Sequence, residues 1–259
     1  MAEDSNNQDG MTRRKFIQNT GLVAAGALGG GLLGGVIGNQ TGDETANTNQ
    51  QNAENTNGTN GDTENRMEAR VFFKRQQDFN VLRSMTERIF PEDDNGPGAI
   101  ELGVPYYIDR QLAGPWGMNA KEYMDGPFEE GADTQGSQTR VPRGDMFLQG
   151  VRRVNAISQD QFGENFFDLE DTGQQNEILS ALENDDVNMN GFSSSEFFST
   201  LVVATMEGAY CDPVYGGNRG MRGWQMKEFP GAQMAYADVI EDEEFHEMDP
   251  VSLHDHHSS

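Results

Sequence analysis

Four glycines within eight residues, at positions 216, 217, 220 and 223, permit positive φ angles and a close approach of the backbone along this stretch of the chain. An apolar segment precedes them and breaks at Asp212-Pro213, where a helix is expected to end. Tyr215 and Trp224 are interleaved with the glycines, and large side chains of this kind argue against a disordered loop. The sequence therefore predicts a long, fixed loop that presents a contact surface.

This loop and the helix end before it contain the residues that we expect to contact a partner. Arg219 and Arg222 stand near aromatic residues, and arginine, tyrosine and tryptophan are enriched at the energetically dominant positions of protein interfaces. The alternative is that the two arginines neutralise local carboxylates such as Asp212 and Glu228. The predicted partner interface consists of Glu207, Asp212, Pro213, Tyr215, Gly216, Gly217, Asn218, Arg219, Arg222 and Trp224.

Apolar residues recur at near-helical spacing along much of the chain before this loop. No segment shows a convincing alternation of apolar and β-branched residues, so strands are not expected. We therefore predict a mainly α fold, a single compact helical domain with long loops over residues 67–240. The expected helical faces carry Phe72, Phe79, Leu82, Met85 and Ile89 before Pro91; Tyr107, Ile108 and Leu112 after Pro105; Phe147, Val151, Val154 and Ile157; Ile178, Leu179 and Leu182; and Phe197, Phe198, Leu201, Val202 and Met206.

Two capping boxes mark the expected starts of the last two helices. Thr172 is followed three residues later by Gln175, and Ser193 is followed in the same way by Glu196. In such a box the first side chain accepts a hydrogen bond from the backbone of the residue three positions on. Thr172 and Ser193 are therefore the expected N-caps.

Residues 1–38 have the composition of an export signal. Arg13, Arg14 and Phe16 belong to a twin-arginine pattern, and an uncharged stretch rich in glycine and alanine follows from Gly21 to Gly38. The arginine pair points to the twin-arginine (Tat) route. Because about 18 uncharged residues can just span a bilayer, the segment is either a signal or a retained anchor. The protein is then expected at the outer face of the cytoplasmic membrane, or in the periplasm or cell envelope.

Two polar segments flank the predicted domain. Residues 39–66 hold hardly an apolar side chain, and they are expected to be a disordered linker because they cannot bury enough surface to offset the entropy lost on ordering. Residues 241–259 form an acidic tail with all four histidines, at positions 246, 254, 256 and 257. Histidines in a polar chain end are usually solvated, and a transition-metal site is the alternative.

Composition narrows the function further. The net charge of -25, from 43 acidic and 18 basic residues, argues against a nucleic-acid partner because such a surface repels polyanions. Cys211 is the only cysteine, which rules out an internal disulfide and a cysteine-ligated cluster within this chain. The predicted domain has no histidine and no Gly-rich βαβ unit for FAD. We therefore expect no catalytic residue, no metal and no cofactor in this chain.

One motif begins like a calcium-binding loop. Asp186, Asn188 and Asn190 have the spacing of its first three ligands, and Gly191 follows. Phe197 stands where the bidentate glutamate is required, which favours a simple turn.

Several irregular motifs in the Gly-rich loop and upstream of it together resemble one family. They are Glu207-Gly208, Asp212-Pro213-Val214-Tyr215-Gly216-Gly217-Asn218-Arg219, Gly223-Trp224 and Phe229-Pro230-Gly231, with Glu87–Pro91, Gly96–Ala99 and Ile108–Pro115 further upstream. These residues are similar to the signature of the gluconate 2-dehydrogenase subunit 3 family. The resemblance covers most of residues 67–240, and the long linker and the histidine-bearing tail depart from it.

The resemblance implies a non-catalytic small subunit of a membrane-associated, FAD-dependent gluconate, sugar or polyol dehydrogenase. In such complexes a large flavoprotein of the GMC type binds FAD and oxidises the sugar, and a cytochrome or quinone-linked subunit often takes the electrons. The small subunit supports maturation of the flavoprotein and its export through the Tat translocase. The implied partners are therefore the flavoprotein, a cytochrome subunit and the translocase.

Two other hypotheses come from different classes. The second is a stand-alone cell-surface binding module that an uncleaved N-terminal anchor holds at the membrane. The third is an independent hydrolase of the paired-carboxylate type, for which the sequence singles out no pair of acids.

Overall fold

The computed structural model describes residues 68–129, 139–237, 239–244 and 246–255. The chain divides into two units, Met1–Arg66 and Met67–Ser259, and everything described below belongs to the second. The predicted export signal and linker lie outside the described residues, as do His256 and His257. Within the described residues, no helix has both the length and the apolar character that a membrane span requires.

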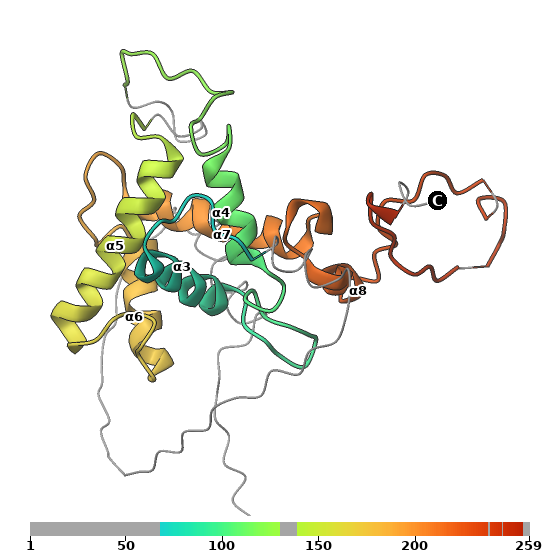
Figure 1. Ribbon diagram of the computed structural model, residues 1–259, viewed down its shortest axis with the longest axis horizontal. Coiled ribbons are helices and arrows are strands. Elements are labelled where there is room, and N and C mark those ends of the chain that lie inside the picture. The colour runs from blue at the N-terminus through green and yellow to red at the C-terminus, as the bar shows by residue number, and fades with distance from the viewer. Residues whose placement is uncertain (1–67, 130–138, 238, 245, 256–259) are drawn as a thin grey trace, which may run out of the picture. The chain divides into compact units, whose positions relative to one another are not determined.

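The described part of the chain is helical, which confirms the predicted fold class (Figure 1). Its regular pairing is limited to two isolated backbone bridges, Asp93 to Gly96 and Gly231 to Val251. The elements are α3 (Gln76–Ile89), α4 (Val104–Ala113), α5 (Arg143–Phe162), α6 (Thr172–Glu183), α7 (Ser194–Tyr210), the 3-10 helices η1 (Pro213–Tyr215) and η2 (Arg219–Met221), and α8 (Arg222–Gln225).

α3 buries most of its predicted apolar face but begins only after Phe72. Phe79 and Leu82 are almost fully buried, and the helix ends at Ile89, two residues before Pro91. The prediction that Phe72 belongs to this helix is wrong, since α3 starts at Gln76. The cause is a side chain from the next helix, which binds the backbone around Phe72.

That side chain is Asp109 of α4. Its carboxylate is 0% exposed and accepts hydrogen bonds from the backbone N–H groups of Val71, Phe72 (3.1 Å) and Phe73 (2.8 Å). Three N–H donors offset the cost of burying the carboxylate charge. The Asp109 carboxylate thus holds residues 71–73 against α4, outside α3, whose first residue is Gln76.

The N-cap of α6 also differs from the prediction. Asp171 caps this helix in place of Thr172, and its carboxylate accepts a hydrogen bond from the Gly173 N–H at 2.7 Å. Gln175, the expected second member of the capping box, is buried and donates to the Phe166 carbonyl at 2.9 Å. The Gln175 side chain is therefore turned into the core, and Asp171, one position before Thr172, caps the helix.

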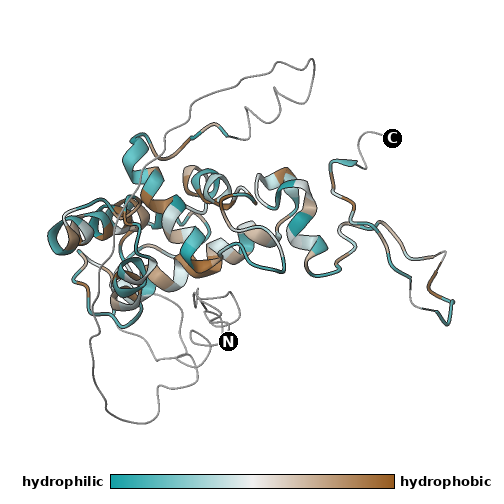
Figure 2. Cartoon of the chain, turned by 90° about the horizontal axis from the view of Figure 1, so that it is seen from below, coloured by the Kyte–Doolittle hydropathy of each residue, from teal (hydrophilic) through white to brown (hydrophobic). Residues whose placement is uncertain are grey.

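α7 is the central helix, since α3, α4, α5, α6 and α8 all pack against it (Figure 1). It starts at the predicted cap, where the Ser193 hydroxyl accepts from the Glu196 N–H at 3.0 Å. Phe197 and Leu201 are both 0% exposed. α5 approaches closely because Gly150 faces Phe197, and a Cβ atom at position 150 would lie 2.5 Å from the ring. The helices show hydrophobic stretches facing inward and hydrophilic ones outward (Figure 2).

The C-terminal segment returns to the loop that follows α7. Gly231 and Val251 form a parallel bridge, and the Ala232 N–H donates to the Val251 carbonyl at 2.7 Å. Backbone pairing therefore joins residues on the two sides of position 240.

We expect Asp109→Ala to lower the free energy of unfolding by about 3 kcal/mol, because it leaves three backbone N–H groups without their acceptor. Urea denaturation followed by helical circular dichroism would measure this change. Asp160→Ala is the matched control, since Asp160 is exposed on α5. Equal effects of the two substitutions would contradict the role given to Asp109.

Candidate functional site

Asn218 fixes the Gly-rich loop to the end of α7. It is 0% exposed, and its backbone is left-handed at φ 45° and ψ 46°. Its side-chain amide donates to the Cys211 carbonyl at 2.8 Å and accepts from the Gly223 N–H at 2.7 Å. Its own N–H donates to the Gly208 carbonyl at 2.9 Å. One buried residue thus joins the last turn of α7, the middle of the loop and the start of α8.

Two glycines permit this close approach. A Cβ atom on Gly217 would lie 2.1 Å from the Gly208 carbonyl oxygen, and one on Gly223 would lie 2.0 Å from the Ala209 carbonyl oxygen. Both contacts are with backbone atoms, which cannot move away as a flexible side chain can. The loop therefore needs glycine here for contact with α7.

Asp212 lies just after the end of α7 and also binds the C-terminal segment. Its carboxylate accepts from the Val214 N–H at 2.9 Å, which caps η1. It further accepts from the Ser252 hydroxyl at 3.0 Å and the Leu253 N–H at 2.8 Å. Asp212 is therefore a buried link between two parts of the loop region and does not pair with an arginine.

Trp224 is a core residue of the loop. It is 5% exposed, its indole N–H donates to the Tyr210 carbonyl at 2.7 Å, and its ring meets Phe229 edge to face with centroids 5.4 Å apart. Such a contact holds α8 against the end of α7.

The outward side of the loop carries exposed apolar groups. Tyr215 is 53% exposed and Val214 is 51% exposed, both on η1. On α7, Val203 is 56% exposed and Glu207 lies one turn further along. The hydroxyl of Tyr107 on α4 donates to the Glu207 carboxylate at 3.5 Å. These residues form the outer surface of a firmly held segment.

The two arginines pair with carboxylates that the sequence did not single out. Arg219 binds Glu68 at 3.1 Å and lies over the Tyr106 ring at 5.2 Å. Arg222 pairs with Glu101, through both its carboxylate and its backbone carbonyl.

Both arginines pair with carboxylates, as the alternative hypothesis expected, but their partners are Glu68 and Glu101 rather than Asp212 and Glu228. Glu68 precedes α3 and Glu101 precedes α4, and folding of the chain brings both carboxylates to the loop.

Burial shifts two pKa values beside this surface. Burial raises the pKa of the Cys211 thiol to about 11, so the thiol is neutral at pH 7 and a weak nucleophile. Burial, together with the nearby Glu207 carboxylate, raises the pKa of Tyr107 above its ordinary value. The sulfur also donates weakly to the Gly208 carbonyl at 3.5 Å.

The other sequence-derived sites behave as simple structural elements where they are described. Asp186, Asn188 and Asn190 lie in the turn between α6 and α7. His246 pairs with Asp242 at 2.8 Å. No group of three potential metal-ligating side chains occurs within the described ranges.

The predicted interface residues therefore separate into two groups. Those that hold the loop are Asp212, Gly216, Gly217, Asn218 and Trp224, and those that reach the surface are Glu207, Pro213, Tyr215, Arg219 and Arg222. Whether the second group touches a partner stays a prediction. Sequence reasoning missed Glu68, Glu101, Ser252 and Leu253, because their contacts with the loop are distant in sequence.

We expect Asn218→Ala to destabilise the domain by about 3 kcal/mol, since it removes two buried hydrogen bonds and disfavours the left-handed backbone. Asn218→Gly should recover only the backbone part of this loss. Tyr215→Ala, on the exposed side of the same loop, should change stability by less than about 0.5 kcal/mol. Thermal unfolding of the three variants measures these differences, and equal melting temperatures would contradict the assignment.

Comparison with known proteins identifies the family. The family model for gluconate 2-dehydrogenase subunit 3 matches residues 76–231, from the first residue of α3 to the glycine that pairs with Val251. No curated protein and no solved structure matches the chain. The match covers more than half of the sequence and includes both the central helix and the loop fixed to it. The chain belongs to the gluconate 2-dehydrogenase subunit 3 family.

Proposed function

We propose that this protein is the non-catalytic small subunit of an exported, FAD-dependent gluconate, sugar or polyol dehydrogenase. In this role it supports maturation of the flavoprotein subunit and its passage through the twin-arginine route. The observation that carries the proposal is the family match over residues 76–231.

The loop geometry supports a role in binding a protein. Tyr215 and Val214 project from a segment that Asn218 and Asp212 hold by buried hydrogen bonds. A surface that is already ordered loses little conformational entropy when it binds, and an exposed tyrosine adds a large contact area with few rotatable bonds. We therefore assign the partner interface to the exposed side of the loop.

The redox chemistry in this proposal belongs to the partner, which carries FAD. The large flavoprotein is the expected direct contact, and a cytochrome subunit completes the route of the electrons. The small subunit contributes its folded surface and its N-terminal twin-arginine segment.

Affinity purification of the tagged full-length chain from its native cell envelope tests the proposal. We expect a flavin absorption spectrum and a second, larger protein that binds FAD. A colourless, solitary protein, from a preparation that preserves complexes, would contradict the proposal and favour a stand-alone surface module.

The double variant Val214→Ser with Tyr215→Ala should reduce the flavoprotein retained per tagged chain by at least about tenfold, since two central apolar contacts are lost. Its helical circular dichroism should stay unchanged because both side chains are exposed. Tyr123→Ala with Lys121→Ala is the matched control on another exposed segment. If both variants retain flavoprotein equally, the loop is not the interface.

Replacing Arg13 and Arg14 together by lysine should keep the protein, and the flavoprotein with it, on the inner side of the membrane. The reason is that the twin-arginine route recognises the arginine pair. Cell fractionation, followed by measurement of flavin in each fraction, shows on which side of the membrane the flavoprotein lies. Normal export of the flavoprotein in this variant would show that the chain does not carry its partner.

A further inference from the structure

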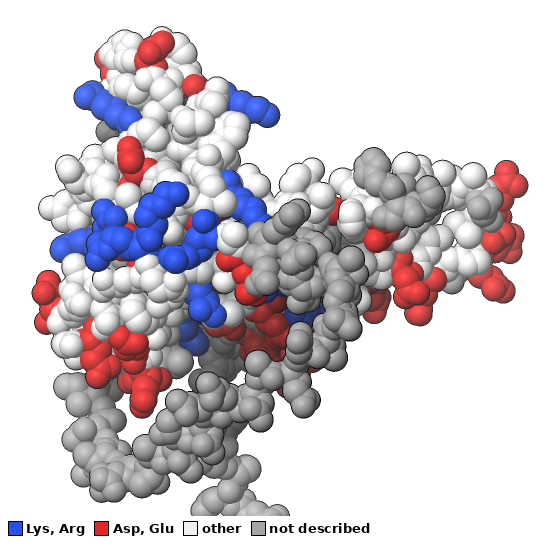
Figure 3. Space-filling model, viewed as in Figure 1, with Lys and Arg blue, Asp and Glu red and all other residues white. Residues whose placement is uncertain are grey.

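Basic side chains gather in one band on a protein whose net charge is -25. Figure 3 shows this band crossing the region of α5 and the start of α3. We define the basic band by Arg70, Lys74 and Arg75 before α3, and by Arg152 and Arg153 on α5; of these, Arg75 and Arg152 are joined through the Asp78 carboxylate.

A buried carboxylate holds the centre of the basic band in place. Asp78 is 4% exposed and accepts hydrogen bonds from Arg152 through Nε at 3.0 Å and Nη2 at 2.9 Å. Arg75 lies 3.8 Å from the same carboxylate. One negative charge thus faces two positive charges, so the cluster keeps a net positive charge. The N-terminus of α3 lies at the same place and adds the positive end of its dipole.

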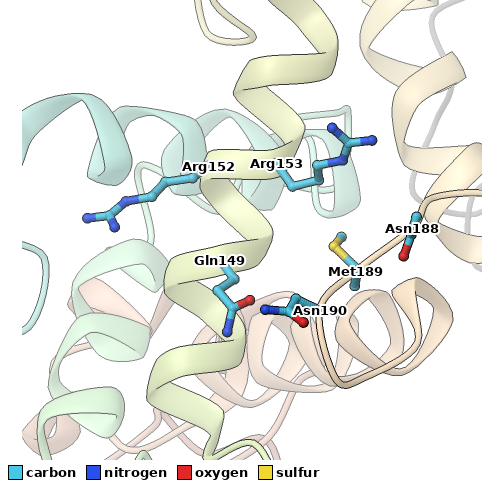
Figure 4. Close-up of a pocket in the computed structure, with 6 residues that line it drawn as sticks. All are labelled: Gln149, Arg152, Arg153, Asn188, Met189 and Asn190. Carbon is cyan, nitrogen blue, oxygen red and sulfur yellow. The ribbon is translucent and has the colours of Figure 1, made fainter.

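The other end of the basic band borders a shallow pocket on α5. The pocket has a volume of about 660 Å³ and is lined by Gln149, Arg152, Arg153, Asn188, Met189 and Asn190, none of which is acidic. Figure 4 shows Arg152 and Arg153 pointing to opposite sides of α5, with Arg153 on the side of Asn188 and Met189. Within the described residues, neither Arg153 nor Lys74 forms an ion pair.

The basic band is connected to the loop surface through one segment. Residues 68–75 begin at Glu68, which pairs with Arg219 of the loop, and end at Arg75 beside Asp78. Asp109 fixes the middle of this segment through the backbone of Phe72 and Phe73. Residues 68–75 therefore connect the loop surface with the basic band, and Asp109 holds this connecting segment in place.

We propose that the basic band is a second contact surface, which binds an acidic surface of the flavoprotein subunit. Arginine forks recognise carboxylates at short range with defined geometry, so a local acidic cluster fits this surface. A membrane with anionic lipids or a nucleic acid is an extended polyanion, so the strongly negative net charge of the whole chain repels it. This inference rests on the proposed function for the identity of the partner.

The test reverses charge at the two cations that the fold does not use in an ion pair. Lys74→Glu with Arg153→Glu is compared with Lys121→Glu with Arg140→Glu, an equal charge change at exposed positions outside the basic band and outside the loop. Each tagged full-length variant is purified from the native cell envelope, and bound flavin is measured per tagged chain. We expect at least a tenfold loss of flavoprotein for the first pair and less than a twofold loss for the second. In 1 M salt the difference should shrink, because charges are screened over about 3 Å.

The outcomes separate the two proposals. If the wild-type chain retains flavoprotein and the two charge-reversed pairs retain it equally, the basic band is not part of the interface and the proposed function stands. If the wild-type chain retains no flavoprotein, the proposed function fails and the partner named for the basic band fails with it. A circular dichroism spectrum equal to that of the wild type shows that a loss at the basic band is not unfolding.

Discussion

The last turn of α7 leaves backbone carbonyls without a helical partner, and the loop that follows supplies their hydrogen bonds. Gly208 accepts from the Asn218 N–H, and Tyr210 accepts from the indole of Trp224. Since α7 also contacts the other long helices, this end of the helix is where the core and the loop become one structure. The positions of the exposed residues of η1 therefore depend on these hydrogen bonds at the end of α7.

Helical spacing was enough to predict the fold class, because the buried faces of α3, α4, α5 and α7 repeat at 3.6 residues. What failed were details decided by contacts between distant residues. Phe72 fits the periodicity of α3, but Asp109 binds the backbone around it and keeps it out of the helix. Thr172 and Gln175 fit a capping box, but the core draws the glutamine inward. The local pattern around Phe72 cannot report a competing partner 37 residues away.

The candidate site shows the same limit. The sequence indicated a fixed loop with interleaved aromatic residues, and the structure shows a fixed loop in which Tyr215 is exposed and Trp224 is buried. It could not show that Arg219 pairs with Glu68 or that Asp212 binds Ser252, because each contact crosses a large part of the chain. Nor can a net charge of -25 show where the positive charges lie. The basic band becomes visible only once α3 and α5 are packed side by side.

The family signature lies mostly in residues that hold the loop rather than residues that face outward. Asn218 and Trp224 are buried, and Gly217 is required by contact with the backbone of α7. Their side chains or close backbone contacts fix the loop to the carbonyl groups at the end of α7. The side chains around Tyr215 and in the basic band are exposed, so a substitution there leaves the buried hydrogen bonds of the loop in place.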